Sequence, residues 1–391
     1  MMKLHFDVSA CVRAKSKFSG CTKCMDVCPD SIVLQDNLPT FKVATGVEAA
    51  ACVGVCPTEA FALSDFSTTE FFFSFLESKI RLISPKLNVP CLSVLSVEHL
   101  ISLALASETP VTLDLNAYDP DSALFDIIEE RIDEANFVLS SFSEKQLETN
   151  AEETSRHTGL DPESHKELED TSGKASEGEA EEEVLASRRS LASLKTIVKH
   201  KKAFEESVDA EELKHFDIDE AVIAKIRDKH LPDKRKILFT TLKRAGAPDV
   251  FEVLPEEDVS FVSQKYVDEK CTNCQICYRI CPTGALSSDG KFSLIHFDAM
   301  LCVKCRLCHD ACEPDAIHLQ KGFEVKEFFE PTQRTLAAFD VKRCNECGNY
   351  FTYTGGEVVC PRCAIEEEEA IFLHENGKKL QAQSEEKKSE A

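Results

Sequence analysis

Between residues 68 and 142, apolar positions follow helical and strand periods in turn. Helical spacing covers Glu70–Ile83, Val97–Ala106 and Asp121–Phe142, whereas Leu87–Leu95 and Val111–Leu115 are rich in β-forming residues. Helices that alternate with strands are typical of a parallel sheet covered by helices. The pattern predicts a small α/β domain over residues 68–143, and without a glycine-rich phosphate loop we expect no nucleotide there.

The apolar pattern stops after residue 143. From Glu144 to Glu183, acidic residues far outnumber basic ones and aromatic residues are scarce, which predicts an acidic disordered linker over residues 144–186. Helical spacing returns in a basic region, residues 187–260, at 188–204, Asp217–His230 and Asp233–Arg244. The basic residues of these helices either dock an acidic partner or the acidic linker, or form a solvated face.

The 391-residue chain has a net charge of −24, which argues against a nucleic-acid partner because phosphates bind clustered Lys and Arg. The most hydrophobic stretch, Leu87–Leu113, is interrupted by Glu98, His99 and Glu108, so we expect no membrane-spanning helix. The first ten residues lack the apolar segment of a secretory signal. We therefore expect a cytoplasmic protein, in which closely spaced cysteines bind metal more often than they form disulfides.

Two copies of the spacing C-x2-C-x2-C-x3-C occur between Cys271 and Cys312. This spacing is typical of [4Fe-4S] ligands, and residues 261–330 resemble the bacterial dicluster ferredoxins. The resemblance implies that the fourth cysteine of each run binds the cluster of the other run. The expected ligands are Cys271, Cys274, Cys277 and Cys312 for cluster 2, and Cys302, Cys305, Cys308 and Cys281 for cluster 3.

Residues 1–67 resemble a degenerate copy of the same plan. Its second run keeps Cys52 and Cys56, but Ala49 and Gly46 stand in the places of the first two cysteines. The crossover rule then leaves one complete set, Cys11, Cys21, Cys24 and Cys56, for cluster 1. Cys28 or Cys52 in place of Cys11 is the rival assignment. Otherwise Cys28 and Cys52 are expected to lie close together as buried thiols, as a redox disulfide or as a two-ligand site.

The last cysteines form two C-x2-C pairs within residues 331–391, which we expect to be a zinc ribbon and a charged tail. The ligands would be Cys344, Cys347, Cys360 and Cys363. The rival interpretation is a rubredoxin-type iron, although the segment between the pairs is short for that. Of the nineteen cysteines, Cys28, Cys52 and Cys91 remain without an assigned metal.

The expected fold class is α+β multidomain, with ferredoxin-like iron-sulfur modules flanking a small α/β domain and a C-terminal zinc ribbon. Three [4Fe-4S] clusters without a recognisable catalytic group indicate electron transfer between other proteins, not an activity of the chain's own. The order of the parts resembles multi-cluster ferredoxin-like proteins encoded beside bacterial molybdenum or tungsten formate dehydrogenases. The resemblance implies such an enzyme as the partner. The alternative function is an assembly, maturation or redox-sensing factor for that enzyme.

Overall fold

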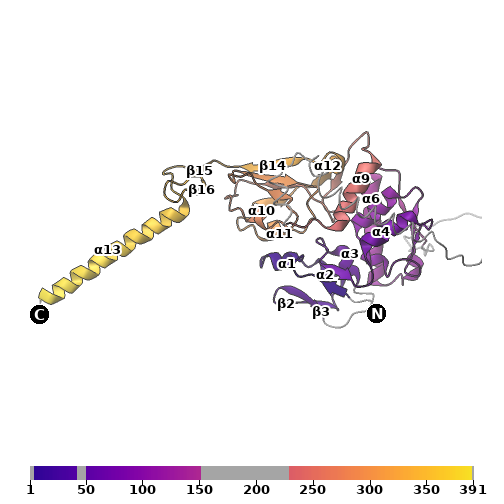
Figure 1. Ribbon diagram of the computed structural model, residues 1–391, viewed down its shortest axis with the longest axis horizontal. Coiled ribbons are helices and arrows are strands. Elements are labelled where there is room, and N and C mark those ends of the chain that lie inside the picture. Colours follow the sequence, from indigo (N-terminus) through magenta and orange to yellow (C-terminus); the bar gives the residue numbers. More distant parts are fainter. Residues whose placement is uncertain (1–3, 42–49, 151–228, 390–391) are drawn as a thin grey trace, which may run out of the picture.

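The computed structural model describes residues 4–41, 50–150 and 229–389 (Figure 1). The predicted acidic linker from residue 151 onward lies outside the described residues. So do the predicted basic helix at 188–204 and nearly all of the one at Asp217–His230. Helices and strands are mixed throughout the described chain, as the sequence predicts.

The amino-terminal segment forms two small antiparallel strand pairs and three short helices. Its elements are β1 (Leu4–Phe6), α1 (Val12–Lys15), α2 (Lys23–Val27), β2 (Ile32–Gln35), β3 (Leu38–Phe41), α3 (Ala51–Val55) and β4 (Phe61–Leu63). Strand β1 pairs with β4, and β2 forms a hairpin with β3. The hairpin turns at Asp36 and Asn37, which both have positive φ angles, as a two-residue hairpin loop requires. Helices α2 and α3 pack together. They contain Cys24 and Cys52, and each is followed directly by a further cysteine, Cys28 and Cys56.

The next segment contains the predicted parallel sheet. Its elements are α4 (Thr68–Glu77), β5 (Leu82–Ile83), η2 (Leu92–Val94), α5 (Val97–Ala106), β6 (Val111–Leu113), η3 (Leu115–Ala117), α6 (Ala123–Ser140) and β7 (Leu147–Thr149). The strand order is β5-β6-β7, and both pairings are parallel. Strand β7 lies beyond the predicted end of the domain at residue 143, because Leu147 is buried against the sheet although its neighbours are polar.

The prediction of a strand at Leu87–Leu95 is wrong. The segment forms a turn followed by the short 3-10 helix η2. Asn88 stabilises the turn, since its side-chain oxygen accepts from the Ser84 amide at 3.0 Å and its amide nitrogen donates to the Leu82 carbonyl at 2.9 Å. Pro90 has no amide hydrogen to give to a neighbouring strand. The high β propensity of the segment reflects its burial instead.

Helix α5 has the bounds that its apolar period predicts, and it begins with a capping box. The Ser96 hydroxyl accepts from the His99 amide at 3.3 Å, and the His99 ring nitrogen Nδ1 accepts from the Ser96 amide at 3.3 Å. Burial lowers the pKa of His99 to about 4. In the folded protein the ring is therefore neutral at pH values where an exposed histidine is protonated.

In the unfolded chain, His99 takes up a proton near pH 6.5, whereas in the folded protein it stays neutral to about pH 4. The free energy of unfolding should therefore fall as the pH drops from about 6.5 towards 4. His99→Gln keeps a side chain that can complete the capping box. We expect it to reduce the stability lost between pH 7.5 and 5.5 by about 1 kcal/mol. Urea unfolding at the two pH values measures this, and an unchanged pH dependence would contradict it.

The carboxy-terminal half begins with α9 (Asp233–Ala245), whose bounds agree closely with the predicted helix at Asp233–Arg244. Its other elements are β8 (Val253–Pro255), β9 (Lys265–Val267), α10 (Ile276–Ile280), β10 (Leu286–Ser287), β11 (Leu294–Asp298), α11 (Leu307–Asp310), β12 (Ile317–Leu319), β13 (Gly322–Glu324), α12 (Lys326–Phe329) and β14 (Gln333–Ala338). Strands β9 and β12 pair, as do β8 and β13, and a third sheet has the order β10-β11-β14. Strand β14 therefore belongs to the sheet that follows α10, although the predicted boundary at residue 330 placed it with the ribbon.

The ribbon consists of β15 (Val341–Arg343), β16 (Tyr350–Thr352) and the start of the long helix α13 (Pro361–Ser389). Helix α13 projects away from the rest of the described chain (Figure 1). In the described residues, no helix is both long and apolar enough to cross a membrane.

The two halves that carry cysteines are packed against each other. Helix α9 lies along α5, and one continuous hydrophobic core extends from α4 through α9 to α12. The Gly20 amide donates to the Asp310 carboxylate at 2.7 Å, and the Ser260 amide donates to the Glu134 carboxylate at 2.6 Å. The first contact joins the segment between α1 and α2 to α11 (Figure 1), and the second joins α6 to the segment before β9. In the described residues, the two halves therefore form one packed body.

Candidate iron and zinc sites

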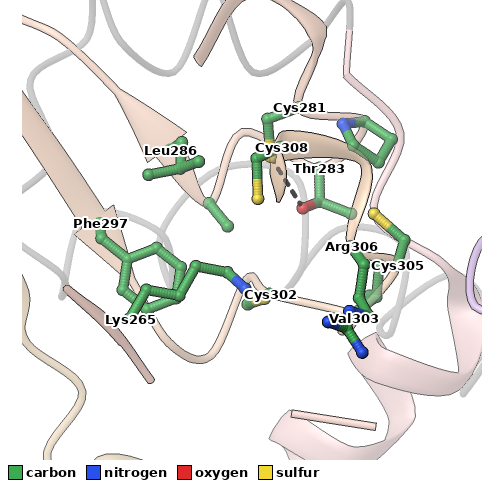
Figure 2. Close-up of a pocket in the computed structure, with 12 residues that line it drawn as sticks. Lys265, Cys281, Thr283, Leu286, Phe297, Cys302, Val303, Cys305, Arg306 and Cys308 are labelled. Carbon is green, nitrogen blue, oxygen red and sulfur yellow. Dashed lines mark hydrogen bonds between the residues drawn. The ribbon is translucent and has the colours of Figure 1, made fainter. Parts of the chain in front are cut away.

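Four cysteines line one cavity in the carboxy-terminal half (Figure 2). They are the four expected ligands of cluster 3, Cys281, Cys302, Cys305 and Cys308. Cys281 follows the last residue of α10, Cys308 lies in α11, and Cys302 and Cys305 lie in the loop before α11. A cavity lined by four thiols matches the donor set of a [4Fe-4S] cluster.

The surroundings of this cavity favour a negatively charged group. Lys265 lines the cavity, is buried, and has its amine 2.9 Å from His309 Nε2. Burial raises the pKa of Cys308 to about 12, and the Lys265 charge acts against that rise. Thiols with raised pKa values keep their protons until a metal displaces them, so iron binding here would release protons.

The expected ligands of cluster 2 are the first three cysteines of the first run and Cys312 of the second. Burial and then the neighbouring thiols raise the pKa of Cys277, with Cys308, Cys271 and Cys274 contributing in that order. The pKa of Cys271 is raised by burial first, and Cys274 and Cys312 add to the rise. Cys277 and Cys308, one from each run, are therefore close enough to interact electrostatically, and so are Cys271 and Cys312.

The two cysteine runs share one backbone conformation. In the first run, Asn273 and Gln275 have positive φ angles of 56° and 70°, and in the second run Lys304 and Arg306 have φ angles of 45° and 61°. The backbone of these four residues is in the left-handed conformation that non-glycine residues seldom adopt. The same strained conformation at matching positions shows that both runs fold in the same way, and such strain is often found at functional sites.

The amino-terminal cysteines of the cluster 1 set are also neighbours. Burial raises the pKa of Cys24 to about 12, and Cys21, Cys56 and Cys11 add to the rise. The Ala60 amide donates to the Cys56 sulfur at 3.3 Å, just as the Ala316 amide donates to the Cys312 sulfur at 3.3 Å. These four thiols match the donor set of one [4Fe-4S] cluster. Cys11 directly precedes α1, Cys21 lies between α1 and α2, Cys24 lies in α2, and Cys56 follows α3.

Cys28 and Cys52 lie beside this set and pair with each other. Their side chains hydrogen-bond to each other, and both are buried. The arrangement favours Cys11 over the rival ligands, because Cys11 is the electrostatic neighbour of the other three thiols.

A buried ionic cluster connects the cluster 1 and cluster 3 sites. Lys234 and Arg235 at the start of α9 both pair with Glu98 of α5, at 3.5 and 3.2 Å. The Lys234 amine donates to the Cys56 carbonyl at 2.8 Å, and the Arg235 guanidinium donates to the Cys302 carbonyl at 3.1 Å. These adjacent cations therefore contact one expected ligand residue from each site.

This ionic cluster is the functional feature that sequence reasoning missed. Lys234 and Arg235 are 3% and 0% exposed, so they do not belong to the basic docking face or the solvated face that the sequence suggested. The available signal was the pair Glu98-His99 inside an otherwise apolar helix. In the sequence analysis, this pair was used only to argue against a membrane-spanning helix. A buried carboxylate in such a helix requires a cationic partner from elsewhere in the fold.

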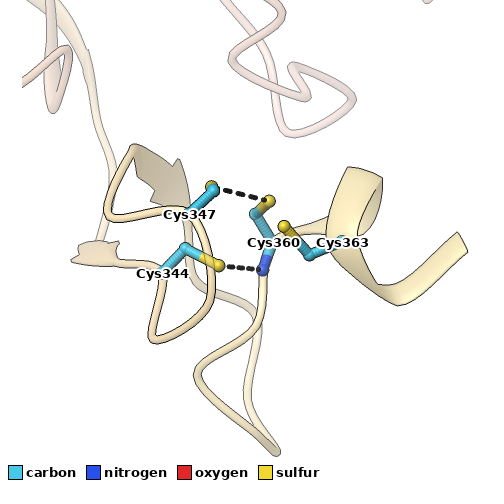
Figure 3. A group of neighbouring side chains, drawn as sticks. All are labelled: Cys344, Cys347, Cys360 and Cys363. Carbon is cyan, nitrogen blue, oxygen red and sulfur yellow. Dashed lines mark hydrogen bonds between the residues drawn. The ribbon is translucent and has the colours of Figure 1, made fainter. Parts of the chain in front are cut away.

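The four carboxy-terminal cysteines form a compact group (Figure 3). The sulfur atoms of Cys344, Cys347, Cys360 and Cys363 all lie within 4.8 Å of one another. The Cys360 amide donates to the Cys344 sulfur at 3.2 Å, and backbone amides, chiefly that of Cys347, lower the pKa of Cys344 to about 6. Four convergent thiols with one favoured as thiolate fit a closed tetrahedral metal site.

Cys347→Ser is expected to remove the metal of this site and unfold the β15–β16 hairpin, since small metal-bound hairpins depend on the metal for their folding. The iron content of the other sites should not change. Metal analysis and limited proteolysis between residues 339 and 361 measure the two effects. Glu346→Gln, at an exposed neighbour of the same turn, is the control. Iron instead of zinc bound to these four cysteines in the purified protein would contradict a zinc site.

Comparisons with known proteins agree with part of this assignment. Residues 265–287 match the family model described as "4Fe-4S binding domain". The chain is 37% identical over 49 residues to the "Hydrogenase-2 operon protein HybA" of Escherichia coli O157:H7 and of Shigella flexneri, a match that covers 12% of this chain and 15% of each relative. It is 38% identical over 52 residues to the "Pyruvate synthase subunit PorD" of Methanocaldococcus jannaschii, covering 13% of this chain and 57% of that protein.

The matches therefore span a small part of the chain and less than two thirds of each relative. No solved structure matches the chain. The chain contains a 4Fe-4S binding domain, and the matches support a role in iron-sulfur electron transfer.

Proposed function

We propose that the chain is an electron carrier with three [4Fe-4S] clusters, in which all three clusters belong to one intramolecular relay. Their proposed ligands are the three cysteine sets described above, and a zinc ion in the ribbon stabilises the carboxy-terminal hairpin. The chain would pass single electrons to or from a cytoplasmic oxidoreductase. A molybdenum or tungsten formate dehydrogenase is the partner that the sequence resemblance suggests.

The observation that carries this proposal is the bridge formed by Lys234 and Arg235. Each contacts the carbonyl of an expected ligand, Cys56 in one site and Cys302 in the other. The contact between Gly20 and Asp310 joins the same two sites at a second point. Electrons that enter at one cysteine set would therefore reach another without dissociation of the protein.

The residues around the sites determine how readily each site accepts an electron. The bound clusters would carry the one-electron redox chemistry, and the protein supplies burial, hydrogen bonds and charge. Amide hydrogens directed at the sulfurs of Cys56 and Cys312 favour the more negative, reduced state. Lys265 acts in the same direction at the cluster 3 site. Glu98 offsets part of the positive charge of Lys234 and Arg235.

Reconstitution tests the function. The anaerobic protein is reduced, mixed with the oxidised candidate oxidoreductase, and followed by the recovery of iron-sulfur absorption. Rapid, reversible oxidation of all the clusters is the expected result. Clusters that resist reduction at accessible potentials, in a protein that binds the metal-free enzyme stably, would contradict electron transfer and support the assembly or maturation role.

A further inference from the structure

Three cysteines are outside the proposed metal sites, and two of them touch. Cys28 follows the last residue of α2, and Cys52 lies in the first turn of α3. Their side chains hydrogen-bond to each other, and they are 6% and 0% exposed. Sulfur atoms in hydrogen-bond contact need only a small approach to form a disulfide.

The pair lies beside the cluster 1 site, because the same two helices carry both. Helix α2 carries Cys24 four residues before Cys28, and Cys56 follows Cys52 by four residues at the end of α3. Cys24 and Cys56 are electrostatic neighbours of Cys52. Two thiols are too few for a four-iron cluster, so iron does not explain why both cysteines occur here.

Arg131 of α6 is a buried cation close to the pair. Its guanidinium donates to the Ala51 carbonyl at 3.2 Å and to the Ser93 carbonyl at 2.6 Å, and its charge acts on both Cys28 and Cys52. Gly54 allows this close packing, since a Cβ atom there would lie 2.5 Å from the guanidinium. A buried cation near a cysteine stabilises its thiolate, and a disulfide forms and opens through the thiolate.

The third cysteine, Cys91, is engaged elsewhere. Its sulfur lies 3.0 Å from the Ser93 hydroxyl, and it accepts from the Tyr118 hydroxyl at 3.5 Å. Cys91 is buried to a similar extent as the pair. It therefore serves as a matched control for substitution of a buried cysteine that binds no metal.

We propose that Cys28 and Cys52 form a further redox centre, a dithiol that closes to a disulfide and exchanges two electrons with cluster 1. The inference rests on the proposed function, because cluster 1 is the electron source. On reduction, cluster 1 delivers two electrons one at a time, the sulfur-sulfur bond breaks, and each sulfur takes up one proton from solvent. On oxidation, both protons leave, the bond forms, and the two electrons return singly through cluster 1. The pair would thus store two electrons in a chain of one-electron carriers.

The test uses the complete wild-type protein with its clusters. Samples are held anaerobically with redox mediators at oxidising and at reducing potentials, quenched in acid with an alkylating reagent, and mapped by mass spectrometry. The oxidised sample should contain a peptide cross-linked between Cys28 and Cys52, and the reduced sample should be alkylated at both. Unlinked thiols in the oxidised sample, with the clusters still cycling, would overturn the inference and leave the proposed function standing.

Reductive titration supplies a second readout. The wild-type protein and Cys91→Ser should each accept about two electrons more than the double variant Cys28→Ser/Cys52→Ser. Equal electron uptake by all three proteins would overturn the inference. Cys21→Ser removes a proposed cluster 1 ligand. If the Cys28–Cys52 disulfide were no longer reduced in this variant, cluster 1 would be shown to deliver its electrons. Unchanged reduction in that variant would exclude cluster 1 as their source. A wild-type protein without cluster 1 would overturn both this inference and the proposed relay.

Discussion

Glu98→Gln is expected to lower the free energy of unfolding by about 3 to 5 kcal/mol, because it leaves two buried cations without their carboxylate. Glu98 is 2% exposed and pairs with both Lys234 and Arg235. Burial on its own would raise the pKa of Glu98, but the charges of Lys234 and Arg235 lower it to about 2. The carboxylate therefore stabilises the fold fully above about pH 4.5, and this stabilisation is lost as the pH falls towards 2.

Urea unfolding at pH 7.5, followed by circular dichroism, measures this effect. Glu129→Gln, at an exposed position of α6, is the matched control and should change stability by less than about 0.5 kcal/mol. If Glu98→Gln behaved like the control, the ionic cluster would not hold α5 and α9 together. The midpoint potentials of clusters 1 and 3 should also rise in the Glu98→Gln protein, because the carboxylate no longer offsets the positive charges of Lys234 and Arg235.

The second large effect is expected at the cavity of cluster 3. Cys305→Ala removes one of the four thiols that line it, so the chain should lose about four irons and four sulfides. The zinc content should not change, because the ribbon cysteines form a separate group.

Iron, sulfide and zinc quantification measures the loss, with Cys91→Ser as the buried-cysteine control. A Cys305→Ala protein with the iron content of the control would contradict Cys305 as a ligand. A protein that loses all its iron would show that cluster 3 is needed for the carboxy-terminal half to fold.

Local patterns in the sequence predicted much of the fold. The apolar periods of α5 and α9 gave their bounds closely, because each helix buries a continuous face. The segment Leu87–Leu95 misled the prediction, since buried β-branched residues are found in turns as well as in strands. Strand β7 has three residues, of which only Leu147 is apolar. The positions of both β7 and β14 depend on partners that are distant in the sequence.

The cysteine spacings predicted which thiols would gather, because each short loop brings nearby cysteines together. The contacts between the sites were beyond such reasoning. Arg235 meets Glu98 across 137 residues of sequence, and a run of basic residues has the same appearance on a surface as at a buried helix end. Only the burial of α9 distinguishes the two cases.

The relay is tested most directly by electron paramagnetic resonance of the fully reduced, anaerobically purified protein, with iron and zinc quantified on the same sample. The account predicts about twelve irons and one zinc per chain, with reduced-cluster signals broadened by magnetic interaction between neighbouring clusters. About eight irons per chain would contradict a cluster at Cys11, Cys21, Cys24 and Cys56. Twelve irons with a cluster 1 signal that shows no interaction with the other clusters would contradict a connected relay.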